Sequence, residues 1–247
     1  PSLVGSEMCI RDSSNACLAR YLDASVVDSA ALTVVSSGTW TVLMAPGAPT
    51  ASLQAERDML ANVDVLGRAT PTARFMGGRE FAALLDGAPA DAGTLADVQA
   101  LVDSATLATP SFAEHGGPFM GRQGCVVRDG KPLPAALPPG QRAALAALYC
   151  AQTTAWVVDR LWGGVVLPRT VVLEGPLAQN TLYLALLQAL LPQARCLASH
   201  DAMEGTARGA WLLSRWGAPA TSELAPVEAA PVAGLAAYHA QWIASAA

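Results

Sequence analysis

The second half of the chain alternates between short β-rich runs and longer stretches with apolar residues at helical spacing. Residues 141–161 form the longest helical pattern, and Gly163 and Gly164 end it. A strand is then expected at 170–173, a helix at about 179–191, a strand at 195–197 and a helix at about 203–216. Strands that alternate with helices favour parallel pairing, with helices on the faces of the sheet.

The first half begins with a different pattern. Residues 32–35 and 41–44 are β-rich, and the Ser-Ser-Gly-Thr link between them predicts a β-hairpin. A third strand is expected near 62–66, and Gly77 and Gly78 open a short helix at 79–85. An antiparallel meander extended by parallel strands is the ribonuclease-H-like arrangement. We therefore predict an α/β fold with a mixed sheet and helices on both faces.

Three boundaries divide the sequence. Residues 1–13 lack the charged region, apolar core and cleavage signature of a signal peptide, and we expect them to be a non-native leader on a chain that is naturally longer. Residues 14–220 are predicted to form one domain. Within it, a weak helix is expected at 95–107, and a loop insertion at about 109–138, where glycines and prolines accumulate. Residues 221–247 are expected to be a C-terminal tail.

Composition excludes several classes of function. The net charge is −5 and no basic cluster is present, so nucleic acid is not an expected partner. No apolar run reaches the length of about 20 residues that a membrane span needs. The histidines have no metal-ligand spacing, and no protein metal site is predicted. Five scattered cysteines without a C-x-x-C pair indicate reduced thiols in a cytoplasmic protein; they are Cys9, Cys17, Cys125, Cys150 and Cys196.

Two turns carry residues suited to an anionic ligand. In VVSSGTW, Gly38 lets backbone N–H groups approach an anion and Thr39 adds a hydroxyl donor; the alternative is an ordinary polar turn. In VVLEGPLAQN, a buried strand ends near Gly175 and a helix follows, which is where ligands bind in parallel α/β sheets. Gln179 and Asn180 would then bond a base or ribose, whereas the alternative is that Asn180 caps the helix.

Three further segments have weaker signals. FMGGREF places Gly78 in a possible nucleotide-facing loop, and the small residues of EGTARGA indicate either tight packing or a wall of an adenine pocket. HGGP at residues 115–118 is similar to an esterase oxyanion loop, but the sequence has no G-x-S-x-G nucleophile elbow. We therefore interpret HGGP as part of a flexible insertion.

In this order and spacing, SSGTW, FMGGREF, EGPLAQN and EGTARGA resemble the C-terminal half of the FGGY carbohydrate kinases, over residues 14–220. The resemblance implies the actin–hexokinase–Hsp70 fold, in which two ribonuclease-H-like domains surround a cleft. It also implies phosphorylation of a sugar, ketose or polyol with ATP and Mg²⁺. The partner domain would be the N-terminal half, which is missing from this chain.

The resemblance implies roles for individual residues. Gly38 and Thr39 are similar to the second phosphate loop, and Gly78 to a glycine that lines the nucleotide cleft. Gly175 and Gln179, with Asn180 nearby, resemble the turn that contacts adenosine. One departure is that many members have Gly-Gly where this chain has Glu174-Gly175-Pro176.

The general base of the family is an Asp just before this region. Here Ser13 stands at that position and Asp12 lies one residue out of register, so no catalytic residue is assigned. The chain alone is expected to bind nucleotide weakly and not to turn over. The alternative function is a non-catalytic interaction domain on the same fold, binding a partner through the surface that a second domain would cover.

Overall fold

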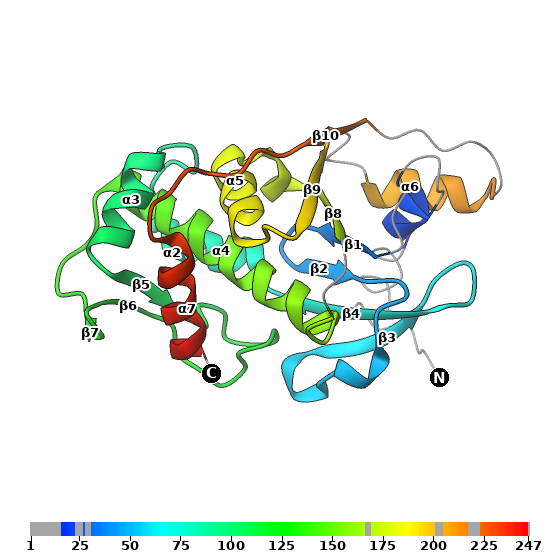
Figure 1. Ribbon diagram of the computed structural model, residues 1–247, viewed down its shortest axis with the longest axis horizontal. Coiled ribbons are helices and arrows are strands. Elements are labelled where there is room, and N and C mark those ends of the chain that lie inside the picture. Colours follow the sequence, from blue (N-terminus) through cyan, green and yellow to red (C-terminus); the bar gives the residue numbers. More distant parts are fainter. Residues whose placement is uncertain are drawn as a thin grey trace.

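The computed structural model describes residues 16–22, 27, 31–165, 169–200, 205–216 and 223–246. Within these residues, seven strands form one mixed sheet in the order β10-β9-β8-β1-β2-β4-β3 (Figure 1). The strands are β1 (Leu32–Ser36), β2 (Thr41–Met44), β3 (Met59–Val63), β4 (Ala69–Phe75), β8 (Arg169–Glu174), β9 (Ala194–Ser199) and β10 (Leu224–Pro226).

The centre of the sheet joins the two halves of the chain. β1 pairs with β8 in parallel and with β2 in antiparallel orientation. On one side β9 continues the parallel pairing and β10 closes the sheet, while on the other side β4 and β3 are antiparallel. The expected antiparallel meander extended by parallel strands is therefore confirmed.

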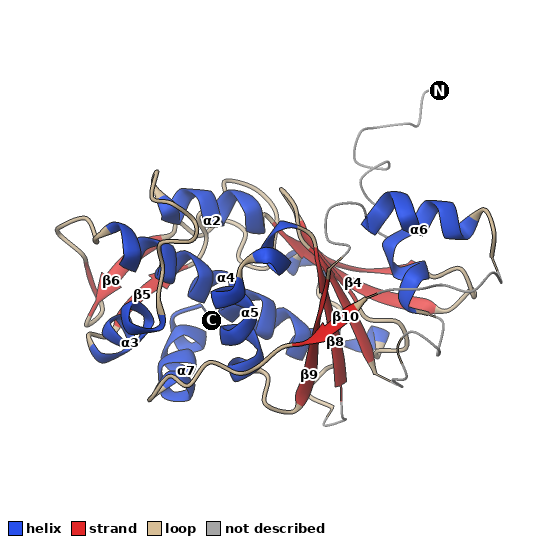
Figure 2. Cartoon of the chain, turned by 90° about the horizontal axis from the view of Figure 1, so that it is seen from above, coloured by secondary structure: helices blue, strands red, loops and turns tan. Residues whose placement is uncertain are grey.

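Helices cover both faces of this sheet, as predicted (Figure 2). The helices are α2 (Gly77–Leu85), α3 (Leu95–Asp103), α4 (Pro139–Leu161), α5 (Thr181–Leu190), α6 (Gly205–Leu213) and α7 (Leu235–Ala246), with short 3-10 turns η1 (Ala19–Tyr21), η2 (Thr50–Ser52), η3 (Ala55–Arg57) and η4 (Pro176–Gln179). α4 and α5 pack on one face, in the larger apolar core. Residues 16–22 and α6 cover the other face, over a smaller core.

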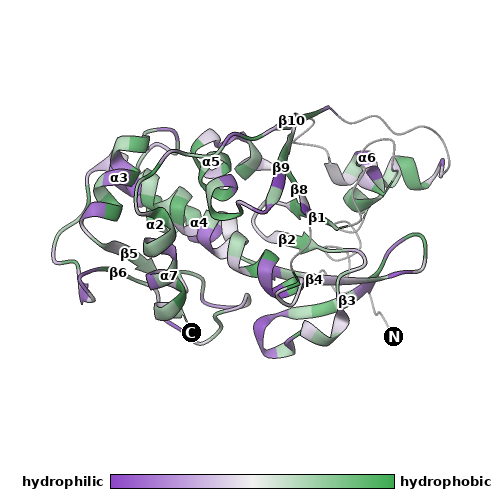
Figure 3. Ribbon diagram, viewed as in Figure 1, coloured by the Kyte–Doolittle hydropathy of each residue, from purple (hydrophilic) through white to green (hydrophobic). Residues whose placement is uncertain are grey.

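α4 is the central helix of the larger core. All of its residues from 143 to 158 are buried, and Figure 3 shows hydrophobic turns on both α4 and α5, with hydrophilic ones between them. Small alanines make this complete burial possible because neighbouring elements can approach the helix on every side. The helix predicted at residues 141–161 is confirmed, and α4 begins two residues earlier, at Pro139.

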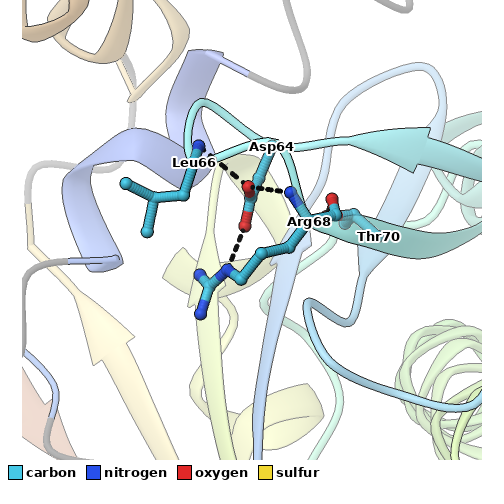
Figure 4. Close-up of polar contacts among 4 residues, drawn as sticks. All are labelled: Asp64, Leu66, Arg68 and Thr70. Carbon is cyan, nitrogen blue, oxygen red and sulfur yellow. Dashed lines mark hydrogen bonds and ion pairs between the residues drawn. The ribbon is translucent and has the colours of Figure 1, made fainter.

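The third strand expected at residues 62–66 is wrong in position. β3 ends at Val63, and residues 64–68 form the turn of the β3–β4 hairpin. The Asp64 carboxylate holds this turn: Oδ1 accepts hydrogen bonds from the amides of Leu66 and Arg68, both at 2.9 Å, and Oδ2 accepts one from Arg68 Nε at 2.8 Å (Figure 4). β4, not β3, pairs with β2, because β4 is largely buried whereas β3 alternates as an edge strand does.

The segment expected as a loop insertion contains strands. Residues 106–132 form a second sheet within the described residues, with β5 (Thr106–Thr109), β6 (Cys125–Arg128) and β7 (Lys131–Pro132) in that order. Asp129 and Gly130, both at positive φ, make the tight turn between β6 and β7. The helix expected at 95–107 is shorter than predicted. α3 stops at Asp103, and residues 106 and 107 belong to β5 instead.

The tail expected at 221–247 is part of the packed structure. β10 pairs with β9, and α7 lies against β5, where Trp242 Nε1 donates to Ala108 O at 2.9 Å. Trp242 is fully buried. The apolar residues of α7 therefore belong to the same core as α4 and α5.

Two expectations from composition are tested by the described residues. None of the helices described is long and apolar enough to cross a membrane. Cys17, Cys125, Cys150 and Cys196 are free thiols, and the first, third and fourth of these are buried. Cys9 and Asp12 lie outside the described residues.

Candidate functional site

The predicted ligand-binding turns meet at one edge of the central sheet. β1 and β8 run parallel, so the turns that follow them lie side by side. β2 is antiparallel to β1 and to β4, so the start of α2, which follows β4, reaches the same edge. We call residues 37–40, 77–78 and 175–180 the carboxyl edge.

Glycines form the contacts between these segments. A Cβ atom on Gly78 would lie 2.4 Å from the carbonyl oxygen of Gly38, and one on Gly175 would lie 1.9 Å from that of Ser37. Gly175 also has φ +85°, a conformation that favours glycine. The two glycines let the turn after β1 pack directly against α2 on one side and against the turn after β8 on the other.

Ser37, which the sequence did not single out, links two of the turns. Its hydroxyl donates to the carbonyl of Glu174 at 2.7 Å and accepts from the amide of Leu177 at 3.0 Å. Its amide donates to the same Glu174 carbonyl at 2.9 Å. Ser37 is buried, so these bonds are shielded from water. The turns that follow β1 and β8 are thereby fixed relative to each other.

Gly38 and Thr39 are accessible residues of the carboxyl edge. Thr39 is exposed. A Cβ atom on Gly38 would meet its nearest neighbour, Trp40 O, at an ordinary 3.6 Å. The fold therefore does not require glycine at position 38, although it does at positions 78 and 175. A glycine that packing does not require is consistent with close approach of a ligand to the backbone.

Gln179 and Asn180 differ in how far they are engaged within the protein. Gln179 is exposed at the end of η4. Asn180 is the N-cap of α5, and its Oδ1 accepts from the amide of Tyr183 at 2.9 Å. Its Nδ2 donates to Ala90 O at 3.5 Å. Asn180 therefore caps α5 in the structure, and contact of Asn180 with a ligand stays a prediction.

The first turn of α2 lies against Gly38 with its amides uncapped. Met76 is the N-cap residue, and among the described residues no side chain accepts from this turn. Uncapped amides at a helix N-terminus favour anions. α2 is fixed from its other side by Glu80, whose carboxylate accepts from Tyr149 Oη and from the amide of Phe112, the latter at 3.0 Å. Burial raises the pKa of Glu80.

The HGGP loop is anchored beside Trp40 rather than extended as a separate insertion. The Asp58 carboxylate accepts from Gly117 N at 3.1 Å and from Arg74 Nε at 2.9 Å. The Arg74 guanidinium lies over the Trp40 ring, 4.4 Å from its centroid, and a Cβ on Gly116 would lie 2.5 Å from that ring. The loop thus supports the residue that follows Thr39.

The small residues of EGTARGA serve tight packing, one of the two interpretations that the sequence allows for that segment. A Cβ on Gly209 would lie 1.8 Å from the carbonyl oxygen of Ala16. Gly205 is equally constrained, because its Cβ would lie 2.6 Å from the carboxylate oxygens of Glu174. α6 is therefore held closely against residues 16–22 and the end of β8.

Potential metal ligands do not gather in the described part of the chain. No group of three or more His, Cys, Asp or Glu side chains suited to an ion occurs there. Glu174, the carboxylate beside Gly175, is buried and bonded to Arg20 and Tyr21. The carboxyl edge therefore offers backbone amides, a hydroxyl and an amide side chain, a donor set that suits phosphate and nucleoside groups better than a cation.

Comparisons with known proteins identify the family and the fold of the chain. A family model for "Carbohydrate kinase FGGY, C-terminal domain" matches residues 29–223. A carbohydrate kinase from Novosphingobium aromaticivorans is 26% identical, with a TM-score of 0.74, covering 96% of this chain and 50% of that chain. A search of curated proteins by sequence finds no match.

More distant solved structures share the fold. A xylulose kinase from Rhodospirillum rubrum is 13% identical, with a TM-score of 0.64, covering 94% of this chain and 49% of that one. Glycerol kinase from Plasmodium falciparum, solved with ADP, is also 13% identical, with a TM-score of 0.52 and coverages of 82% and 40%. The chain thus spans about half the length of these kinases.

The ribonuclease-H-like fold expected from the sequence is the fold of these kinases. The matched residues include all three segments of the carboxyl edge. Since the family model covers most of the chain, the match establishes the relationship that the motifs suggested. The chain belongs to the FGGY carbohydrate kinase family, and its matched residues form the C-terminal domain of that family.

Proposed function

We propose that the complete enzyme transfers the γ-phosphoryl group of ATP to a hydroxyl of a sugar, ketose or polyol, and that this chain supplies the ATP-binding surface. The observation that carries the proposal is the direct packing of the Gly38 turn between α2 and the Gly175 turn. Three segments far apart in sequence supply uncommitted polar groups at one place. Family membership and the kinases of the same fold support the reaction class.

Each residue has a proposed role in this surface. The amide of Gly38 and the hydroxyl of Thr39 hold ATP phosphates, and Gly78 lines the cleft beside them. Gly175 and Gln179 contact adenosine, with Asn180 near them. The support is that packing does not require glycine at position 38, that Thr39 and Gln179 are exposed, and that the amides of the first turn of α2 are uncapped. Backbone donors fixed by packing stabilise phosphate charge without reorganising during transfer.

The remaining parts of the reaction are proposed to lie outside this surface. Mg²⁺, when bound with ATP, would neutralise phosphate charge, and the described residues of this chain offer it no carboxylate cluster. The general base, the sugar contacts and the first phosphate loop belong to an N-terminal domain. We place the enzyme in the cytoplasm, where ATP is available and free thiols remain reduced.

Nucleotide binding by this chain tests the proposal. Titration calorimetry with ATP and Mg²⁺ should give weak but saturable binding, because this chain spans about half the length of the kinases it matches and supplies one wall of the proposed cleft. Gly38→Ala should lower the affinity about tenfold without loss of stability, since its Cβ fits the fold but obstructs the ligand. Thr39→Val should also lower it, whereas Thr39→Ser, which keeps the hydroxyl, should not.

Two results would contradict the proposal. One is equal affinity for ATP in the wild-type chain, Gly38→Ala and Thr39→Val, which would place the nucleotide elsewhere. The other is the absence of ATP binding at millimolar concentration. Sugar-dependent release of ADP by the chain alone would contradict the narrower expectation that it does not turn over.

The alternative function, a non-catalytic interaction domain, is favoured by one surface. The hairpin patch, which we define as Val63, Val65 and Leu66, is 64%, 43% and 52% exposed at the tip of the β3–β4 hairpin. Asp64 holds this tip rigidly (Figure 4). A cavity of about 240 Å³ lies between the tip, residues 16–22 and Leu213 of α6. Exposed apolar residues beside a cavity are typical of interaction sites.

The gene upstream of this segment discriminates between the two functions. An in-frame region that encodes a D-x-G-T phosphate loop and an intact base would support the kinase. A stop codon or an unrelated domain would support the interaction domain, and binding of a partner to the hairpin patch would then be the property to measure.

A further inference from the structure

Glu174 is a charged residue in an apolar setting at the end of β8. It is 2% exposed. Its Oε2 accepts a hydrogen bond from Tyr21 Oη at 3.0 Å and lies 3.4 Å from a guanidinium nitrogen of Arg20, which is 1% exposed. Residues of the smaller core, among them Cys17 and Leu18, surround this cluster.

Stability alone does not account for this ion pair. Removing two charges from water costs free energy that their attraction often does not restore, and apolar residues of similar volume are frequently as stable or more so. What a buried pair does provide is a defined geometry, because each charge must keep its partner. Burial, together with the charge of Glu174, raises the pKa of Tyr21, so its hydroxyl remains a donor.

The same residue touches three elements at once. Its main-chain carbonyl receives two hydrogen bonds from Ser37, the residue before Gly38. Its side chain binds Arg20 and Tyr21 of η1, and its carboxylate packs against Gly205 at the start of α6. Glu174 therefore connects the carboxyl edge with residues 16–22 on the smaller core.

We propose that Glu174 is a positioning residue that keeps residues 16–22 and the first turn of α6 in register with the carboxyl edge, so that nucleotide bound at the edge also orders residues 16–22. This inference rests on the proposed function, because it needs a nucleotide at the edge. Ligand binding that restricts the edge reduces the fluctuations of any element rigidly attached to it.

Hydrogen exchange of the chain, read by mass spectrometry with and without the non-hydrolysable analogue AMP-PNP and Mg²⁺, tests the inference. In the wild-type chain with nucleotide bound, the amides of residues 16–22 should exchange at no more than about one third of their rate without nucleotide. In Glu174→Gln the affinity should change little, because the main-chain carbonyl still accepts from Ser37. The protection of residues 16–22 by nucleotide should nevertheless be lost.

Two further variants keep the test decisive. Tyr21→Phe removes only one donor to the carboxylate and should lose part of the nucleotide-linked protection, even if Glu174→Gln folds poorly. Glu228→Gln, at an exposed position, should behave as the wild type. A purely structural role for Glu174 would lower the stability of the variants and leave the nucleotide-linked difference in exchange unchanged.

The outcomes separate this inference from the proposed function. Nucleotide binding without protection of residues 16–22 in the wild type, or full protection in Glu174→Gln, overturns the positioning role and leaves the nucleotide site intact. Failure of the wild-type chain to bind AMP-PNP at all overturns the proposed function, and the inference with it.

Discussion

At the scale of single residues, individual groups connect the distant segments of the carboxyl edge. The Ser37 hydroxyl is both donor and acceptor between the turns that follow β1 and β8. Glycines at positions 78 and 175 allow the backbone contacts on either side of it. At this scale the edge is fixed by the absence of a side chain at Gly78 and Gly175 and by the buried hydroxyl of Ser37.

Ser37→Ala should destabilise the fold. It leaves the amide of Leu177 without its buried acceptor, which costs about 1–3 kcal/mol. Urea denaturation followed by circular dichroism measures the change. Ser214→Ala, at an exposed position, is the matched control and should be nearly neutral. An equal midpoint for Ser37→Ala and the wild type would show that water replaces the lost bonds.

His239 should make stability dependent on pH. Burial lowers its pKa below 6.5, against the weaker effect of Asp159, and its ring stacks on Trp242. The unfolded chain therefore binds more protons than the folded one as the pH falls below 6.5, and stability decreases. Denaturation at about pH 7.5 and about pH 5.5 should show a smaller decrease for His239→Gln than for the wild type. Identical decreases would exclude His239 as the source.

Secondary-structure elements differ in how far their sequences define them. β1, β2, α4 and β8 were predictable because each is a continuous apolar or periodic run. β4 was missed since Pro71, two threonines and Arg74 interrupt its apolar pattern, although pairing on both sides buries most of it. The Asp129–Gly130 turn was a usable hairpin signal for β6 and β7.

The candidate site was predictable only where a local sequence pattern marks its residues. Gly38 and Gly175 follow predicted strands and Gly78 opens a predicted helix, so all three were recognisable from local sequence. Ser37 and Glu174 were not, because their roles depend on the pairing of β1 with β8, which no local pattern reports. The contact of Trp40 with Arg74 depends likewise on tertiary packing.

α3 offers a prediction at the scale of one element. Thr94 caps it in a reciprocal capping box with Asp97, in which the Thr94 hydroxyl accepts from the Asp97 amide at 3.2 Å. Thr94→Ala should lower the free energy of unfolding by about 1 kcal/mol, whereas Thr94→Ser should retain most of it. Chemical denaturation of both variants checks this. A Ser variant as unstable as the Ala variant would mean that the cap contributes little.

At the scale of the whole molecule, the smaller core is covered less completely than the larger one. Residues 16–22 and α6 lie over it, and the hairpin patch stands beside them, with Trp211 and Trp216 exposed on and just after α6. The larger core, by contrast, includes residues of α4, α5 and α7 in one continuous cluster. Most of the large exposed apolar side chains of the described residues thus lie at the hairpin tip and on or just after α6, with Leu95, Met120 and Val165 elsewhere.

The hairpin patch should make the isolated chain self-associate. Val63→Thr combined with Leu66→Gln should reduce concentration-dependent association in sedimentation velocity, because apolar contacts drive it. Leu95→Gln, which changes an exposed leucine on α3, is the control and should have no effect. Association that persists unchanged in the double variant would assign it to another surface.

The parallel pairing of β1 with β8 has a consequence for biosynthesis. Ser37 and Glu174 are 137 residues apart in the sequence, so the ribosome releases the β1–β2 hairpin long before its other neighbour exists. Until β8 emerges, the edge of β1 that β8 will occupy has to stay unpaired with other strands. Such non-local pairing slows folding, so assembly of the turns at the carboxyl edge becomes a late event in the maturation of the nascent chain.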